Sequence, residues 1–121
     1  MTALDTDTIA AIATARGDGP VGIIRLSGPK ALTIATTLSQ NHFEPRHAHL
    51  CVFTTARGDV IDSGLGLYFP LPHSFTGEDV IELQIHGGHI VLQALLTRCL
   101  ELGARAARPG EFSERSFLNG K

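Results

Sequence analysis

The sequence predicts an α+β domain with a mixed, mostly antiparallel sheet and helices packed on one side of it. Segments rich in β-branched and aliphatic residues outnumber the segments with helical spacing, and the two kinds do not alternate strictly along the chain. That order weighs against a doubly wound dinucleotide-binding fold. With 121 residues, 43% of them hydrophobic and 18% charged, the chain has the size and composition of one globular domain.

The first half predicts two strands, a helix and then further strands. Residues 8–14 and 21–26 are apolar and β-branched, and a turn-forming segment at 15–20 separates them. Residues 29–39 follow as a helix with proline in its first turn. Further strands are expected at 49–55, at 60–62 after a Gly-Asp turn, and at 64–70.

The second half contains the clearest alternation of apolar and polar residues in the chain. In residues 80–86, Ile81, Leu83 and Ile85 share one face, while valine, glutamate, glutamine and histidine share the other. Residues 89–102 carry a wide apolar helical stripe, and Gly103 stands where a carboxyl-terminal cap is expected. A short strand at 104–107 and a helix at 111–118 complete the chain.

The net charge of −2 argues against a broad basic surface for nucleic acid. Arg105, Arg108 and Arg115 nevertheless give the last stretch a mild positive excess. This excess is either a solvated face or an RNA-docking surface, although stacking aromatic residues are missing nearby.

The sequence predicts a cytoplasmic protein with no membrane association. Apolar runs are far shorter than a membrane span, and acidic residues stand where a signal peptide would be basic. Cys51 and Cys99 are expected to be buried thiols, not a disulfide or a nucleophile.

Two charged residues stand out within strands. Glu82 lies on the polar face of its strand, where a carboxylate could accept from a ring N–H and an exocyclic amine of a pterin together; a plain solvent-facing strand is the alternative. Arg25 interrupts an apolar strand, so it needs an anion or carbonyl partner, or an ion pair with Glu82 itself.

Other chemistries find less support. The only Gly-Lys pair, Gly120-Lys121, lacks the upstream glycine of a phosphate-binding P-loop. Gly87-Gly88 could offer backbone N–H groups to an anion, but a tight turn is the commoner explanation. The histidines have no acidic or cysteine partner at a ligand spacing, so we expect no metal site, and no catalytic triad follows from the spacing.

Four segments together resemble the MnmE (TrmE) family of tRNA modification GTPases: residues 7–14, 21–29, 67–88 and 107–121. The resemblance implies that residues 1–121 form a folate-binding and dimerisation domain, similar to half of the folate domain of aminomethyltransferases. It implies 5-formyltetrahydrofolate or 5,10-methylenetetrahydrofolate as ligand and a homodimer in which a first strand pairs with the other subunit. Its folate-contacting positions carry over to Arg25, Glu82 and Lys121.

The resemblance also implies a larger enzyme. In the family, a helical domain and a GTPase domain follow, with sites for GTP, Mg²⁺ and K⁺. The whole protein works with the flavoprotein MnmG to add a carboxymethylaminomethyl group to the wobble uridine of tRNA. The present chain is expected to bind folate without GTPase activity of its own and to contribute no catalytic residue.

Two departures and one rival accompany this resemblance. The loop at 15–20 differs from the family's proline-rich loop, and Ile85 replaces a common glycine, so its side chain could narrow the approach to the pocket. Phe75 or Phe69 could flank a bound ring. The rival is a free-standing aminomethyltransferase-like enzyme, whose acid or base would be one of three residues: Glu78, Asp79 or His86.

Overall fold

The computed structural model describes residues 7–13 and 21–121. Within them the α+β prediction is confirmed. The loop expected to differ at residues 15–20 lies outside the described residues. The elements, in chain order, are β1 (Ile9–Ile12), β2 (Gly22–Ser27), α1 (Ala31–Ser39), β3 (His49–Thr54), β4 (Val60–Phe69), β5 (Val80–Ile85), α2 (Gly88–Glu101), β6 (Arg105–Ala106) and α3 (Glu111–Leu118).

The strands form one six-stranded sheet in the order β3-β4-β5-β2-β1-β6. Every neighbouring pair is antiparallel except β1 and β6, which are parallel. This mixed, mostly antiparallel sheet is the predicted one. Its order brings β5 and β2, the two strands that carry Glu82 and Arg25, together at the centre.

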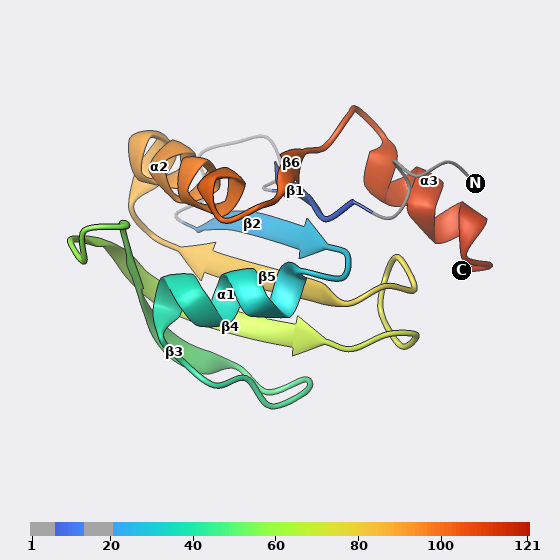
Figure 1. Ribbon diagram of the computed structural model, residues 1–121, viewed down its shortest axis with the longest axis horizontal. Helices are drawn as coiled ribbons and strands as arrows, with labels where there is room; N and C mark the ends of the chain where they lie inside the picture. The colour runs from blue at the N-terminus through green and yellow to red at the C-terminus, as the bar shows by residue number, and fades with distance from the viewer. Residues whose placement is uncertain (1–6, 14–20) are drawn as a thin grey trace.

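The core lies between the sheet and two helices, α1 and α2, which cover the same face (Figure 1). Ile81, Leu83 and Ile85 point into it and are fully buried, as the alternation in β5 predicts. Each such side chain stabilises the fold by about 1.5–3 kcal/mol relative to an exposed one. Because Ile85 packs into this core, the expectation that it narrows a pocket on the polar face is wrong.

Helix α3 stands apart from α1 and α2, beyond one end of the sheet (Figure 1). The turn before it is made by Gly110, with a φ of +75° that favours glycine. Helix α2 ends as expected, with Gly103 at a φ of +120° and its N–H bonded to the carbonyl of Leu100.

The expectation of two short strands at 60–62 and 64–70 is wrong, because β4 runs unbroken from Val60 to Phe69. A Cβ at Gly64, within this strand, would lie 1.8 Å from the carbonyl oxygen of Gln84, so glycine lets β4 and β5 approach each other.

Both cysteines are buried and free, as predicted. Burial raises the pKa of the Cys99 thiol to about 12 and also raises that of Cys51. In the part of the chain that the structure describes, every helix is too short or too polar to cross a membrane.

Candidate functional site

Arg25 and Glu82 face each other across the centre of the sheet. They are direct partners in the β2–β5 register, on the face opposite α1 and α2. The guanidinium Nη2 donates to Glu82 Oε2 at 3.2 Å, and the two side chains are 29% and 22% exposed. The ion pair considered from the sequence therefore forms, but both groups remain accessible to a ligand.

A cavity of about 390 Å³ opens over this pair. Phe69, Phe75 and Val80 line it together with Arg25 and Glu82. The Phe75 ring is half exposed, and its centroid lies 5.8 Å from the Arg25 guanidinium carbon, within cation–π range. The pocket thus combines charged groups with aromatic walls, and its size falls in the usual range for small-molecule sites.

The Glu82 carboxylate is held at both oxygens. Oε2 accepts from Arg25, and Oε1 accepts a longer hydrogen bond, 3.4 Å, from Nε2 of Gln84 on the same strand face. These contacts orient the carboxylate. A planar ligand with two adjacent N–H donors could replace both of them.

Lys121, the third residue carried over from the resemblance, does not line this cavity. Its backbone N–H donates to the carbonyl of Ser116. Its Cε lies 3.6 Å from the position that a Cβ on Gly77 would occupy, in the loop that carries Phe75. The structure thus brings Arg25 and Glu82 together and puts Lys121 beside the loop at the pocket's rim.

The two acids considered for the rival enzyme are engaged elsewhere. Glu78 accepts from Ser27 Oγ at 2.7 Å and from Arg115 Nη1 at 3.1 Å. Asp79 accepts from the Tyr68 hydroxyl and a loop N–H, and it helps to raise the pKa of Tyr68, which burial raises most. His86 is exposed, and neither it nor the two acids line the cavity.

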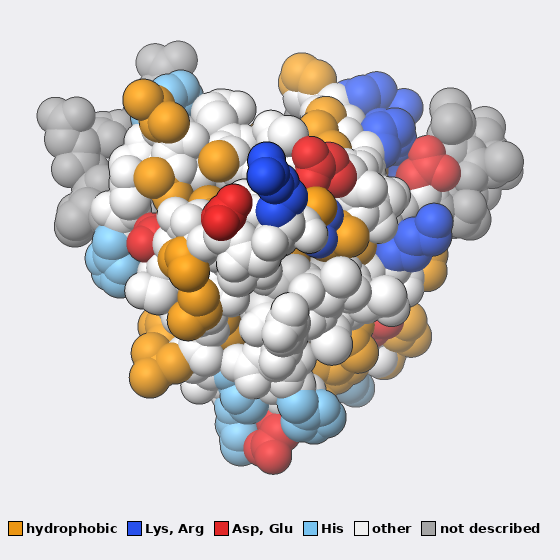
Figure 2. Space-filling model, turned by 60° about the vertical axis from the view of Figure 1, so that its left-hand side comes forward, with side chains coloured by type: hydrophobic (Ala, Val, Ile, Leu, Met, Phe, Trp, Pro, Cys, Tyr) orange, Lys and Arg blue, Asp and Glu red, His pale blue; other side chains and the backbone are white. Residues whose placement is uncertain are grey.

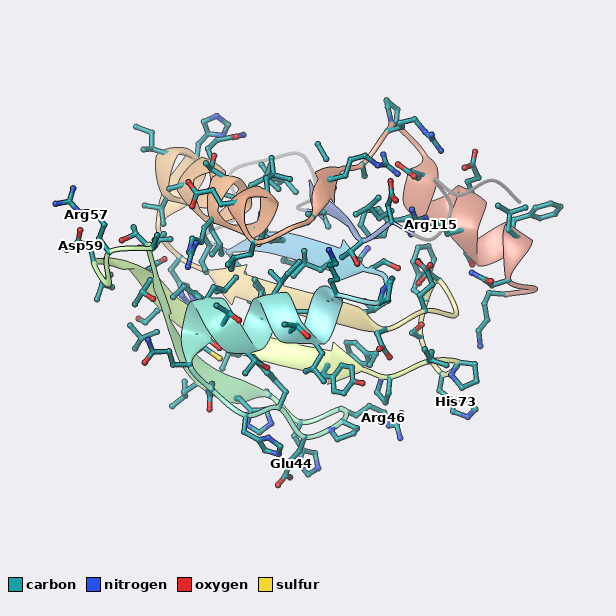
Figure 3. The ribbon with its side chains drawn as sticks, viewed as in Figure 1. Glu44, Arg46, Arg57, Asp59, His73 and Arg115 are labelled. Atoms are coloured by element: carbon teal, nitrogen blue, oxygen red, sulfur yellow. The ribbon has the colours of Figure 1, made fainter. Side chains whose placement is uncertain are left out.

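The histidines give no metal centre within residues 7–13 and 21–121. His47 contacts the exposed Glu44 at 3.1 Å, at the end of the molecule where Figure 3 labels Glu44 and Arg46 and Figure 2 shows histidine side chains gathered. His49 accepts from the backbone N–H of Glu44. On the face drawn in Figure 2, basic side chains are interspersed with acidic and apolar ones, and none of them forms a broad patch.

Two of the three arginines considered for RNA docking serve the fold instead. Arg115 is only 2% exposed, and Figure 3 shows it between α3 and the sheet. Arg105 makes two hydrogen bonds to Glu111, at 2.7 and 3.1 Å, and a third to Asp7. Arg108, which is half exposed, still pairs with Glu111 and Glu114. The positive excess at the carboxyl end is therefore largely neutralised within the molecule.

Glu111 is buried at the centre of a network of ion pairs with Arg105, Arg108 and Arg115. Hydrogen bonds from Arg105 lower the pKa of its carboxyl from 4.5 to about 2, against the raising effect of burial, with help from the N–H and charge of Arg108. Arg115 also contacts this carboxylate, at 3.4 Å. In the sequence, this network is signalled by the short spacings of Arg108, Glu111 and Arg115. The link from Arg115 to Glu78 joins distant segments and has no sequence signal.

The protein-family comparison matches residues 8–121 to the GTP-binding protein TrmE N-terminus. Among curated proteins, the chain is similar to the tRNA modification GTPase MnmE of Pseudomonas paraeruginosa, with 66% identity over 116 residues. It is also similar to the same-named protein of Xylella fastidiosa strain 9a5c, with 64% identity over 115 residues. These alignments cover 96% and 95% of the chain but 26% of each relative, so the chain spans about a quarter of their length. By this match, the chain belongs to the TrmE N-terminus family.

Proposed function

We propose that this chain binds a reduced folate, 5-formyltetrahydrofolate or 5,10-methylenetetrahydrofolate, in the pocket over Arg25 and Glu82. The observation that carries the proposal is a half-buried carboxylate at the floor of an aromatic-walled cavity of about 390 Å³. A pterin presents a ring N–H beside an exocyclic amine, and the two Glu82 oxygens can accept from both. The family resemblance supports the same residues.

Binding is an exchange of partners at Glu82. The pterin donors take over the positions now held by Arg25 and Gln84. Arg25, released from Glu82, then has donors for the pterin carbonyl or for the carboxylates of the folate tail. Phe75 or Phe69 packs against a ring, and Lys121 approaches from the loop side with its positive charge.

Isothermal titration calorimetry with 5-formyltetrahydrofolate tests this assignment. Glu82→Ala is expected to weaken binding by tenfold or more, because a charged hydrogen-bond acceptor contributes about 1.5–3 kcal/mol. Glu44→Ala, which removes an exposed carboxylate that does not line the pocket, should bind like the wild type. Equal affinities for wild type and Glu82→Ala would show that the pterin does not bind at Glu82.

We further propose that the chain forms a homodimer through the β3–β4 part of the sheet face that α1 and α2 leave open, beside the pocket. The register puts Leu50 opposite Leu65 on this face, and Leu67 opposite Glu82. Leu50 is 83% exposed and Val52 50% exposed. Exposed apolar side chains on a sheet often mark an interface, and a second copy would cover them symmetrically.

The dimer is tested by sedimentation equilibrium. Leu50→Asp is expected to shift the protein towards monomer, because it places a charge in the apolar contact. Thr37→Asp, an exposed substitution on α1, is the control. An unchanged association constant for Leu50→Asp would place the interface elsewhere.

For the longer protein, we propose that this domain supplies the folate site of a tRNA modification GTPase. This rests on the names of relatives that are about four times as long and on the family resemblance. GTP, Mg²⁺ and K⁺ would bind outside this chain, whose sequence has no P-loop. MnmG and tRNA would be partners of the longer protein in the cytoplasm. Comparing wobble-uridine modification by wild-type and Glu82→Ala forms of that protein tests the role of this pocket.

A further inference from the structure

The loop between β4 and β5, residues 70–79, carries Phe75 at the rim of the pocket. The residue after Phe75, Thr76, is fully buried, and its hydroxyl lies 2.7 Å from the hydroxyl of Ser27. Ser27 ends β2, two positions after Arg25 on the same face of the sheet. The loop is therefore fastened at a point next to the charged floor of the pocket.

The same loop is also fastened to the end of α3. Nδ2 of Asn119 donates to the carbonyl of Thr76 at 2.9 Å and, at the same distance, to the carbonyl of Arg115 within α3. A Cβ on Gly77 would lie 2.9 Å from the Asn119 Cβ, so glycine at this position permits the close approach. Gly77 also has a φ of +83°. Asn119 thus bridges the last turn of α3 and the loop.

A second connection between α3 and the loop is made by charged groups. Arg115, buried in α3, donates to both carboxylate oxygens of Glu78, at 3.1 and 3.3 Å. Glu78 in turn accepts from Ser27. Helix α3, the loop and the end of β2 are therefore joined by two sets of contacts, which meet at Ser27 and Arg115. Lys121 lies two positions after Asn119 in the chain.

We propose that Asn119 and Arg115 are positioning residues for the pocket, so that occupancy by folate and the docking of the end of α3 stabilise each other. This inference rests on the proposed function. Asn119 holds the backbone of Thr76, and with it the adjacent Phe75, over the floor of the pocket. It also fixes the point from which Lys121 extends. By thermodynamic reciprocity, a ligand held by the ordered loop also orders the end of the helix.

Calorimetry with 5-formyltetrahydrofolate on the 121-residue chain tests this coupling. Asn119→Ala is expected to weaken binding about tenfold, the effect of losing its hydrogen bond to the Thr76 carbonyl in the loop. Glu114→Ala, which removes a half-exposed carboxylate from the same helix, should leave the affinity unchanged. Asn119→Asp keeps the side-chain shape but loses the amide donor, so it should match Asn119→Ala. If Asn119→Ala unfolds, Asn119→Asp serves in its place.

Hydrogen exchange separates coupling from a general loss of stability. In the wild type, folate should slow exchange at the amides of Gly77 and Glu78, in the loop, and at those of Gly120 and Lys121, after α3. In Asn119→Ala at saturating folate, the protection after α3 should vanish while protection within β5 remains. If both Asn119 variants bind folate with wild-type affinity and keep the protection of the amides after α3, this inference is wrong, while the proposed function still stands. A wild type that binds no folate would overturn the proposed function and this inference with it.

Discussion

Replacing Glu111 with glutamine should remove a defined, pH-dependent part of the stability of the fold. The residue is 2% exposed, and the pKa of its carboxyl falls from 4.5 to about 2 in the folded state, chiefly through hydrogen bonds from Arg105. A folded pKa below the unfolded one means that the ionised group stabilises the fold at high pH. The stabilisation is complete above about pH 4.5 and is lost as the pH falls through 2.

The size of the effect follows from the difference between the two pKa values. At pH 7 the ionised Glu111 contributes about 3 kcal/mol, since one pKa unit corresponds to about 1.4 kcal/mol. At pH 3 the contribution falls to about 1 kcal/mol, and by pH 2 most of it is lost. Glutamine resembles the protonated carboxyl, so Glu111→Gln should be about 3 kcal/mol less stable than the wild type at pH 7 and nearly equal to it at pH 2.

Urea unfolding followed by far-ultraviolet circular dichroism between pH 2 and 7 measures this difference. Because the other carboxyls titrate in both proteins, subtracting the two curves isolates Glu111. Glu114→Gln, on the exposed side of the same helix, should differ from the wild type by less than about 1 kcal/mol at every pH. A difference for Glu111→Gln that stays constant from pH 7 to pH 2 would refute the reasoning.

Two further predictions concern the core. Gly64→Ala should lower the free energy of unfolding by several kcal/mol or prevent folding, since its Cβ would lie 1.8 Å from the Gln84 carbonyl oxygen. Ser63→Ala, at an exposed neighbouring position in β4, should leave the free energy of unfolding nearly unchanged in the same urea titration. Equal stability of the two variants would contradict the packing argument. Cys51 and Cys99 should resist a thiol-specific disulfide reagent at pH 8 while the chain is folded and react at once in urea, because burial keeps both thiols protonated. Rapid labelling of the folded chain would contradict their burial.

The elements with a complete local signal could be predicted from the sequence. The alternation of Ile81, Leu83 and Ile85 defined both β5 and its buried face, and the apolar stripe before Gly103 defined α2. The unbroken β4 could not be predicted, because the need for glycine at position 64 comes from the backbone of β5, which the local sequence of β4 does not contain. A glycine has the same local signature in a turn and at a close approach between strands.

The candidate site, like the fold, could be predicted only in part from the sequence. The pairing of Arg25 with Glu82 could be anticipated as one of two alternatives, because each is a charged residue within a strand and needs a partner. Phe69 and Phe75 join them in one cavity because of the path of the β4–β5 loop, which has contacts with β2 and α3 as well as within itself. None of these contacts can be read from the local sequence. Arg105 and Arg115 were candidates for a surface role because sequence shows the charge of a residue but not its burial. Their partners Asp7 and Glu78 are distant in the chain.

Glu111 and Glu82 illustrate how exposure separates a structural carboxylate from one that can bind a ligand. Glu111 is 1% exposed at its side chain and accepts from Arg105, Arg108 and Arg115, so a ligand could reach it only if α3 moved. Glu82 is 22% exposed and has one charged partner, which is itself accessible. Exchange of partners therefore costs little at Glu82 and much at Glu111. An ion pair in a half-open cavity can be traded for a ligand, and this property, not the charge alone, makes Glu82 the residue on which folate binding is proposed.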